Sequence, residues 1–425
     1  MRILLTGATG LIGSAVGVTL RSEGHTVVGV THGYTRNGNV NWITLDIADA
    51  TDTKDWSPHL VGVDAVVNCA GVLQDSPRDS TMGVHHDGAA ALFLACEKAG
   101  VRRVVHVSAI GVDRASTEFS RTKLAGDRAL MALDLDWVIL RPSVVVGRQA
   151  YGGSALIRAL AALPILPKVP DAGLLQVVQL NDLVRTISFF VDPNSPMRLV
   201  LEIAGPERLT LTDVVRAYRR WFGWGEPRLL NLPTWLFNAM YRVGDTVGLL
   251  GWRAPLRGTT KIEIAHGAVG DPSEWIRITG IVPKPLSKAL AAEPASVQEK
   301  WFARLYLMKP FVLGVLSLFW LMTGLIALGP GLTTGIGLLN QAGLSSIAPS
   351  MMVIGAVADI LIGIGIAFRK TARIALYGAL LLCVIYFITS TILVSWLWLD
   401  PLGPMLKIVP IIVLNLIALA ILSDR

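Results

Sequence analysis

The residues near the start of the chain that could do chemistry are three evenly spaced glycines. Gly7, Gly10 and Gly13 lie in the segment TGATGLIG, between a short apolar run at 2–6 and a helical stretch that reaches about Arg21. In this setting the first glycine permits a tight turn, the second lets the backbone approach a pyrophosphate, and the third lets helix and strand pack closely. Because the helix N-terminus then faces the phosphates, the pattern predicts a dinucleotide-binding turn.

Other reactive residue types do not gather in the sequence. The three cysteines, Cys69, Cys96 and Cys383, fit a reducing compartment, and none is paired at the spacing of a metal site, so no bound metal is expected. The sequence also lacks a basic patch interleaved with aromatic residues. Nucleic acid is therefore not an expected partner.

Strands and helices that alternate along the first 150 residues position the glycine turn. Strand-like runs follow the turn at Thr26–Val30, Trp42–Leu45, Ala65–Asn68, Arg103–Ser108 and Trp137–Leu140, separated by helical stretches. Alternation at this pitch predicts an α/β fold with a doubly wound parallel sheet. Residues 231–251 are rich in tryptophan, leucine and methionine, which leaves two alternatives: a helix that covers the pocket, or a helix that lies on a membrane surface.

The composition argues against a purely soluble enzyme. Hydrophobic residues make up 52% of the 425 residues and charged residues only 16%, whereas soluble domains carry about 25% charged residues. The apolar excess lies near the C-terminus, where no charged residue occurs between Lys309 and Asp359. A helix that crosses a bilayer needs about 20 apolar residues. We therefore expect an all-α domain of four membrane spans, near 310–328, 350–368, 374–398 and 402–422.

The basic residues beside these spans predict the orientation of the chain. Lysine and arginine precede the first span and occur in the loop between the second and third spans, whereas the loop at 329–349 has neither. These basic residues are Lys300, Arg304, Lys309, Arg369, Lys370 and Arg373. Positive residues mark the cytoplasmic side of a span. The expected location is the cytoplasmic (inner) membrane, crossed several times, with the soluble domain and both termini in the cytoplasm.

Motifs over roughly residues 1–290 resemble the short-chain dehydrogenase/reductase superfamily, in its extended or atypical branch of epimerase-like and NmrA-like proteins. They occur in a consistent order: TGATGLIG at 6–13, Asp46-Ile47, VNCAG at 67–71, VVHVSAIG at 104–111, RPSVVVG at 141–147, VVQLNDLV at 177–184 and IAGPERLTLTDVV at 203–215. The resemblance implies a Rossmann fold with a small substrate-covering region and a bound nicotinamide dinucleotide.

The resemblance also implies which residues form the cofactor site. Gly7, Gly10 and Gly13 would take the pyrophosphate, Asp46 and Ile47 would flank the adenine, and Ala70 and Gly71 would line the ribose and nicotinamide side. The remaining residues expected in this site are Thr9, Leu11, Ile12, Cys69, Pro142 and Ser143.

The catalytic residues implied by the resemblance are incomplete. The superfamily uses a tyrosine and a lysine four residues apart on a helix, together with a serine at the end of an earlier strand. Ser108 and Lys123 stand at two of these positions, but Phe119 stands at the tyrosine position. Phenylalanine has no proton to donate or accept. Lys123 and Ser108 are still expected to contact the cofactor.

The end of the second predicted strand bears on which nicotinamide dinucleotide is bound. An NAD-selective site usually has an acidic residue there, which binds the ribose 2′-hydroxyl. The sequence has His32 instead, with Arg36 shortly after it, and no acid. Because cations favour a 2′-phosphate, we expect NADP(H) to be preferred over NAD(H).

The C-terminal spans resemble the DoxX-like family of small membrane domains. The matching segments are WLMTGL at 320–325 in the first span and GAVADILIG at 355–363 in the second. Asp359, in the second segment, is the acidic residue well inside a span, and a carboxyl group in that place usually faces a cavity or a partner. A proton or quinone role and a packing role both remain open for Asp359.

These features predict a membrane-anchored NAD(P)(H)-binding protein with four parts. They are a nucleotide-binding core at 1–150, the rest of the extended fold at 151–286, a linker at 287–305 and a four-span domain at 306–425. The first hypothesis is an oxidoreductase that acts on a membrane-soluble quinone or lipid. The alternative is a catalytically inactive sensor or an assembly subunit with a membrane protein partner, because Phe119 replaces the tyrosine.

Overall fold

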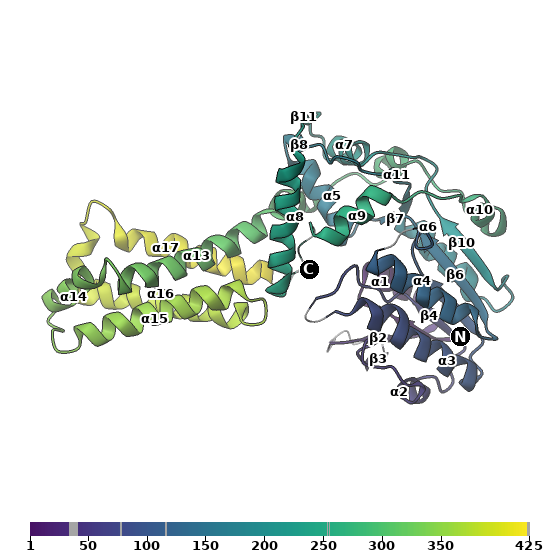
Figure 1. Cartoon of the computed structure of the whole chain (residues 1–425), viewed down its shortest axis with the longest axis horizontal. Helices are drawn as coiled ribbons and strands as arrows, with labels where there is room; N and C mark the ends of the chain where they lie inside the picture. The colour runs from purple at the N-terminus through teal and green to yellow at the C-terminus, as the bar shows by residue number, and fades with distance from the viewer. Residues whose placement is uncertain (34–40, 77–78, 115–116, 253, 255, 423–425) are drawn as a thin grey trace. The chain divides into compact units, whose positions relative to one another are not determined.

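The structure is a computed structural model that describes residues 1–33, 41–76, 79–114, 117–252, 254 and 256–422. The chain folds into two compact units. The first, the nucleotide unit, contains Met1–Thr246 and Ala254–Ala303, and the second, the membrane unit, contains Val247–Arg253 and Arg304–Arg425. Figure 1 shows the elements of both units along the chain.

A seven-stranded sheet forms the centre of the nucleotide unit. Its strand order is β10-β6-β5-β4-β1-β2-β3, and all neighbouring strands are parallel. The strands are β1 (Arg2–Thr6), β2 (Thr26–Thr31), β3 (Asn41–Thr44), β4 (Ala65–Asn68), β5 (Arg103–Val107), β6 (Asp136–Pro142) and β10 (Leu199–Ile203). The order reverses between β1 and β4, which is where parallel sheets of this type bind ligands. The predicted doubly wound sheet is confirmed.

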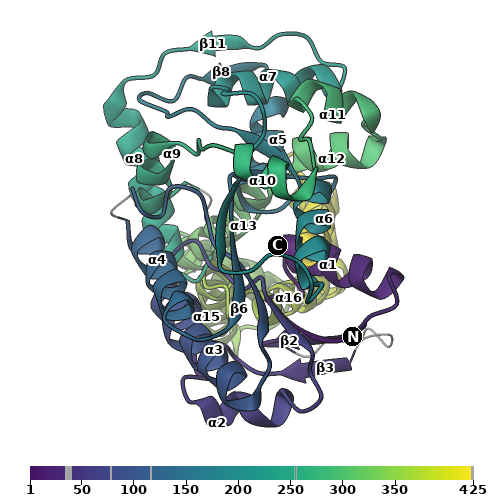
Figure 2. The ribbon, with the colours of Figure 1, turned by 90° about the vertical axis from the view of Figure 1, so that its right-hand side faces the viewer.

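Helices cover both faces of the sheet (Figure 2). On one face, α1 (Leu11–Ser22) and α6 (Leu180–Val191) pack together, and their apolar side chains share a core with β1, β4, β5 and β6. On the other face lie α3 (Gly88–Ala99) and α4 (Glu118–Met131), with a second core. The strands are apolar on both faces because each face is buried.

Shorter elements complete the nucleotide unit. Before α3 lie α2 (Thr53–Trp56), η1 (Ser57–His59) and the π-helical turn η2 (Gly83–Asp87). Two small parallel pairs, β7 (Val144–Val146) with β9 (Val177–Gln179) and β8 (Ile165–Pro167) with β11 (Arg228–Leu230), lie after β6. The helices of this part are α5 (Gly152–Ala162), α7 (Leu211–Trp221), α8 (Thr234–Leu249), α9 (Gly258–His266), α10 (Ser273–Thr279), α11 (Leu286–Ala292) and α12 (Val297–Leu305).

The segment 287–305, for which we expected a linker, is folded. It forms most of α11 and all of α12, and Leu286 and Ala303 lie in the core of the nucleotide unit. Glu299 is 7% exposed and accepts a hydrogen bond from Nε of Arg148 at 3.0 Å. Small and charged residues resembled a linker because their partners, such as Arg148, lie far away in the sequence.

The membrane unit contains four helices that are long and apolar enough to span a bilayer. They are α13 (Met308–Leu328), α15 (Ala348–Ala367), α16 (Ala372–Leu393) and α17 (Pro404–Leu422). The residues predicted as a loop at 329–349 include a further helix, α14 (Leu332–Gln341), and η3 (Ser395–Trp398) ends the third predicted span early. The backbones of α13 and α15 approach closely: a Cβ on Gly363 would lie 2.6 Å from the backbone N of Leu321.

The end of α8 belongs to the membrane unit. Residues 247–252 pack on the turn between α15 and α16, where Nε1 of Trp252 donates a hydrogen bond to the carbonyl of Ala367 at 2.7 Å. The guanidinium of Arg369 lies over the Trp252 ring, 5.4 Å from its centroid. Neither sequence-based alternative for 231–251 included this contact, because the sequence does not show which distant residue a tryptophan side chain meets.

Candidate functional site

The glycine turn between β1 and α1 requires glycine at two positions. Gly7 has a φ of +63°, and a Cβ there would lie 2.6 Å from the carbonyl O of Cys69. A Cβ on Gly13 would lie 2.3 Å from the carbonyl O of Gly7. The amide of Gly10 donates to the same Gly7 carbonyl at 2.9 Å. The turn is therefore tight, and no side chain at Gly7 or Gly13 fills the space in front of the N-terminus of α1.

The predicted cofactor residues gather at one edge of the sheet. They follow the carboxyl ends of neighbouring strands: His32 after β2, Asp46 and Ile47 after β3, Cys69 to Gly71 after β4, Ser108 after β5, and Pro142 with Ser143 at the end of β6. Thr9, Leu11 and Ile12 lie in the glycine turn and the first turn of α1. Arg36 lies outside the described residues.

Two of these residues have polar groups that are already engaged within the protein. The hydroxyl of Ser143 donates to the carbonyl of Ala268 at 2.8 Å, and Oδ1 of Asp46 accepts from the amide of Ala48 at 3.0 Å. They shape the edge of the site. Among the predicted site residues, Ser108 and Lys123 are therefore the side chains whose polar groups are best placed to contact a ligand.

Lys123 is buried at the centre of this edge. Its Nζ donates to the carbonyls of Ala70 at 3.2 Å and Val107 at 3.0 Å, so it links the ends of β4 and β5. Burial lowers the pKa of Lys123 to about 8, since desolvation disfavours the ammonium, although the nearby Asp127 opposes this. The ammonium has a third N–H left for a ligand.

Ser108 and Phe119 lie beside Lys123 in the candidate catalytic set. Ser108 is 5% exposed, and its Oγ has no partner at full hydrogen-bond geometry among the described residues, although it lies near enough to Asp127 to help lower the pKa of that carboxyl group. A buried hydroxyl without a partner is costly unless a ligand or water meets it. Phe119 packs edge-on against the imidazole of His85, with ring centroids 5.5 Å apart. The tyrosine position is thus held in place by ring packing and offers no proton.

His85, on the turn before α3, forms part of the wall of the site. Its Nε2 accepts from the amide of Val72 at 3.0 Å, and its Nδ1 lies 2.9 Å from Oγ1 of Thr122. Burial lowers the pKa of His85 to about 2, and the charge of Lys123 lowers it further. The imidazole is therefore neutral and cannot replace the tyrosine as an acid.

A chain of buried polar groups runs beneath the site, and the sequence analysis missed it. Oγ1 of Thr6 donates to Asn68 at 2.5 Å, the amide of Asn68 lies 3.1 Å from Nδ1 of His106, and Nε2 of His106 lies 3.4 Å from Asp127. Nε and Nη2 of Arg141 lie 3.1 and 3.0 Å from Asp127. The available signal was that Asp127 and Lys123 share one helix face.

The charges in this chain follow from its partners. Burial alone would raise the pKa of Asp127, but His106, the Ser108 hydroxyl and the Arg141 guanidinium hold it below its ordinary value. Burial lowers the pKa of His106, so the imidazole is neutral while Asp127 and Arg141 form a buried ion pair. This pair connects α4, which carries Lys123, to strand β6.

These residues fit a nicotinamide dinucleotide on two observations. The Gly7–Gly13 turn forms a cradle that any side chain would fill, and Ser108 presents a buried hydroxyl without a partner. The cradle suits a pyrophosphate, whereas Ser108 and Lys123 suit a ribose or a reacting carbonyl. Among the described residues, no group of three His, Cys, Asp or Glu side chains could hold a metal ion.

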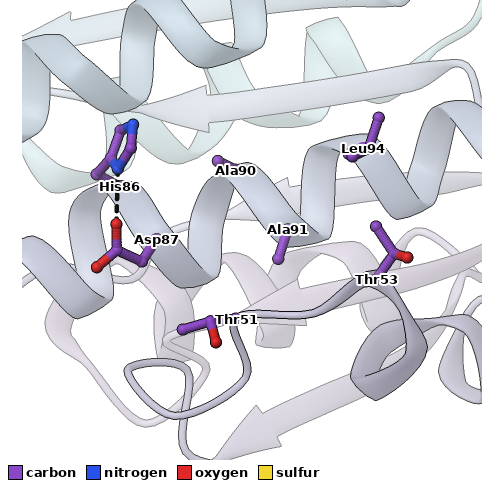
Figure 3. Close-up of a pocket in the computed structure, with 7 residues that line it drawn as sticks. All are labelled: Thr51, Thr53, His86, Asp87, Ala90, Ala91 and Leu94. Atoms are coloured by element: carbon purple, nitrogen blue, oxygen red, sulfur yellow. Dashed lines mark hydrogen bonds and ion pairs between the residues drawn. The ribbon is translucent and has the colours of Figure 1, made fainter.

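A separate depression lies on the outer side of α3. It is lined by Thr51, Thr53, His86, Asp87, Ala90, Ala91 and Leu94. Figure 3 shows His86 pointing toward Asp87, and their Nδ1 and Oδ1 atoms lie 2.8 Å apart. None of the predicted cofactor residues lines this depression. It therefore belongs to a different surface from the nucleotide site.

Two protein families match different parts of the chain. Residues 7–158 match the NAD(P)H-binding family model, and residues 317–416 match the DoxX-like family model. The chain joins an NAD(P)-binding Rossmann domain to a DoxX-like domain. The first match contains the glycine turn, Ser108 and Lys123, and the second contains Asp359. The resemblances drawn from the sequence motifs are confirmed at this level.

Several curated proteins are similar to the Rossmann domain. An uncharacterized protein of Mycobacterium tuberculosis is 29% identical over 226 residues, which are 52% of this chain and 23% of that protein. The ceramide reductase of Caulobacter vibrioides is 24% identical over 238 residues, 54% of this chain and 73% of the reductase. The chain thus spans about a quarter of the length of the mycobacterial relative.

Solved structures share the fold of the Rossmann domain and of the residues that complete the nucleotide unit. MoeE5 in complex with UDP-glucuronic acid and NAD has a TM-score of 0.53 and 20% identity, and the match covers 72% of this chain and 99% of MoeE5. The Bordetella bronchiseptica enzyme WbmH in complex with NAD+ also has a TM-score of 0.53, with 18% identity, 72% of this chain and 98% of WbmH covered. These likenesses show the fold, and the NAD(P)H-binding family match supports a nicotinamide dinucleotide as the cofactor class.

We predict that Gly13→Ala abolishes nucleotide binding by full-length protein. The added Cβ overlaps the Gly7 carbonyl, so the turn must shift, at a cost of about 1–3 kcal/mol in unfolding free energy. Titration with NADPH and with NADH measures the effect. Gly153→Ala is the control, because nothing lies within 4 Å of the added Cβ. Unchanged affinity in Gly13→Ala would contradict the assigned cradle.

We also predict a pH dependence from Lys123. Its folded pKa of about 8 lies below the unfolded value of about 10.4, so the unfolded chain binds more protons between these pH values. Stability therefore rises with pH across this window, and Lys123→Met removes that rise. Hydrogen exchange of the β5 amides, corrected for intrinsic rates, measures it in the full-length protein. Lys54→Met, at an exposed lysine on α2, should keep the wild-type slope.

Proposed function

We propose that the protein is a membrane-anchored, NAD(P)H-dependent reductase that acts on the carbonyl group of a membrane-soluble quinone or lipid. The observation that carries this proposal is the pairing of Ser108 and Lys123 at the nucleotide edge. Ser108 has a buried hydroxyl without a partner at full hydrogen-bond geometry, beside Asp127, and Lys123 has an unused N–H. A protein that needed the nucleotide only for packing would have no use for either group.

The residues of this chain divide the chemistry between them. When bound, the nicotinamide supplies a hydride to the carbonyl carbon. Ser108 donates a hydrogen bond to the carbonyl oxygen, and Lys123 supplies the proton that this oxygen takes up as it becomes an alcohol. A lysine with a pKa of about 8 is protonated at neutral pH and can release its proton. In this way Lys123 performs the step that Phe119 cannot perform.

The membrane unit supports the choice of substrate class. Four apolar helices and the DoxX-like match indicate a membrane protein, so the nucleotide unit works beside a lipid phase. The similar ceramide reductase of Caulobacter vibrioides has a lipid in its name. Basic residues near α13 and in the α15–α16 turn favour a cytoplasmic nucleotide unit and cytoplasmic termini on an inner membrane.

The domain limits inferred from the sequence remain part of this proposal. We infer that 1–150 binds the nucleotide, 151–286 covers the substrate, and 306–425 holds the chain in the membrane. The segment 287–305 then acts as a folded connection, since α12 packs on the nucleotide unit and runs almost directly into α13.

Phe119 favours a second candidate function. The superfamily tyrosine is absent, and the phenylalanine is packed against a neutral His85. A sensor or assembly subunit that binds NAD(P)(H) without turnover needs only the glycine cradle and the hydrogen bonds of Lys123. This candidate requires tight nucleotide binding and no hydride transfer.

Phe119→Tyr tests the two candidates. In a reductase, the new hydroxyl lies four residues before Lys123 on α4 and adds a stronger acid, so turnover of NADPH with a long-chain ketone or decyl-quinone rises by about 10²-fold. Lys123→Met should abolish wild-type turnover. Phe189→Tyr, at a half-exposed ring on α6, is the matched control. If wild type and Phe119→Tyr both bind NADPH without oxidising it, the reductase proposal fails and the second candidate stands.

The proposed preference for NADP(H) has its own test. If Arg36 and His32 bind the 2′-phosphate, Arg36→Ala weakens NADPH binding about tenfold or more through loss of a charged hydrogen bond, and leaves NADH binding unchanged. His32→Ala should have a smaller effect in the same direction. Arg128→Ala, on the exposed side of α4, controls for net charge. Equal loss of affinity for both nucleotides would contradict the preference.

A further inference from the structure

Each long helix of the membrane unit places one polar side chain in the shared core. Trp320 on α13, Asp359 on α15 and Asn415 on α17 are 2%, 3% and 0% exposed. Tyr386, on α16, is partly buried and packs against the same apolar cluster, which includes Trp320 and the residues around Asn415. Asp359 lies on the face of α15 that carries Ile362 and Ile366 of this cluster.

The polar residues lie at a similar depth in the helix bundle. Nη2 of Arg369 donates to the carbonyl of Leu422 at 3.0 Å, so the end of α17 lies level with the turn that ends α15. At 1.5 Å per residue, Asp359 and Asn415 are about 12 Å and about 10 Å from these helix ends. Gly324, one turn after Trp320, packs against the backbone of Ile360, next to Asp359.

The hydrogen bonds of this cluster are incomplete. The Tyr386 hydroxyl donates to Oδ1 of Asp359 at 3.2 Å, and Nδ2 of Asn415 donates to the carbonyl of Ile411 at 2.8 Å. Oδ1 of Asn415 and Nε1 of Trp320 have no partner among the described residues. The bilayer core holds no water to meet such groups, so an unpaired donor and an unpaired acceptor are costly there.

A neighbouring polar residue shows that this incompleteness is specific. The hydroxyl of Ser317, also on α13, donates to the carbonyl of Gly363 at 2.8 Å. The same core therefore satisfies a polar group when its only role is to join two helices. Trp320 and Asn415 present the opposite case: they are large, fully buried polar side chains, and Nε1 of Trp320 and Oδ1 of Asn415 have no partner among the described residues.

We propose that Trp320, Asp359, Tyr386 and Asn415 bind the neutral, hydroxyl-bearing head of a membrane-soluble molecule. A hydroxyl can accept from the indole N–H and can donate to the amide oxygen, so one kind of head group suits both unpaired groups. The other charged residues of the four helices, Lys309, Arg373 and Lys407, are near helix ends. No cation is thus placed at the depth of Asp359 to bind a phosphate.

This site deepens the proposed function, and the identity of its natural ligand rests on that function. Reduction of a lipid carbonyl gives a hydroxyl, so the product of the proposed reaction has the head group that the cluster fits. The membrane unit then acts as an acceptor for the alcohol product. Binding of a hydroxyl-bearing lipid does not itself need hydride transfer, so it can be measured separately.

The test uses full-length protein in phosphatidylcholine nanodiscs and a pair of photoactivatable probes. One probe is a long-chain alcohol with a diazirine in its chain, and the other is its methyl ether, which cannot donate a hydrogen bond. We expect the alcohol to label α13 and α17 in the core and to be displaced by unlabelled dodecanol. Asn415→Leu and Trp320→Phe should each raise the concentration of alcohol probe needed for half-maximal labelling about tenfold. Ser317→Ala should leave that concentration unchanged.

The thermal midpoint of ligand-free protein separates a binding role from a packing role. Asn415→Leu removes an unpaired amide, so the midpoint should stay at the wild-type value or rise; a packing role would lower it. If the midpoint of Asn415→Leu falls, the labelling of Trp320→Phe distinguishes the two roles, because a binding role requires weaker labelling of that variant. Equal labelling by alcohol and ether, or labelling unchanged in Trp320→Phe, overturns the proposal. NADPH turnover is measured on the same samples, so a failure of the reductase proposal is seen independently of the labelling.

Discussion

The nucleotide unit depends on one buried carboxylate. Asp127 is fully buried, and it is acceptable there because Arg141 binds it with two nitrogen atoms and His106 lies against its other oxygen. Removing one partner would leave a buried charge unpaired. The free-energy cost of that unpaired charge is far larger than the net stabilisation that the ion pair provides. The pair therefore sets the position of α4 on strands β5 and β6. Lys123, one turn earlier on α4, takes its place between Ala70 and Val107 as a consequence.

The glycine turn imposes the second constraint on the nucleotide site. The Gly7 carbonyl receives the Gly10 amide and contacts Gly13, so β1, the turn and α1 form one rigid piece. Parallel strands bring their carboxyl ends to this same edge. In the proposed function, Ser108 and Lys123 thus meet a cofactor that the turn holds in a fixed place. The site keeps binding and positioning groups while Phe119 removes the usual acid, and this contrast is the central chemical question about the protein.

The two units treat buried polar groups in different ways. In the nucleotide unit, buried polar side chains run from Thr6 to Arg141, with Nε2 of His106 3.4 Å from Oδ1 of Asp127, and Ser108 lies at the predicted ligand site. In the membrane unit, Ser317 is satisfied but Trp320 and Asn415 are not. An unpaired buried group is tolerated where a ligand completes it.

The sequence alone determined the fold class, the glycine turn, the two family resemblances and the four spans, because these depend on local periodicity and on short motifs. It also located Ser108, Phe119 and Lys123 by their order along the chain. Only the tertiary structure decided that 287–305 is folded, that Trp252 packs on the α15–α16 turn, and that Ser143 is engaged with Ala268. The Asp127 network and the unpaired atoms of Trp320 and Asn415 were equally invisible in sequence. Each depends on partners far apart in the chain, and residue type does not reveal which distant groups a side chain meets.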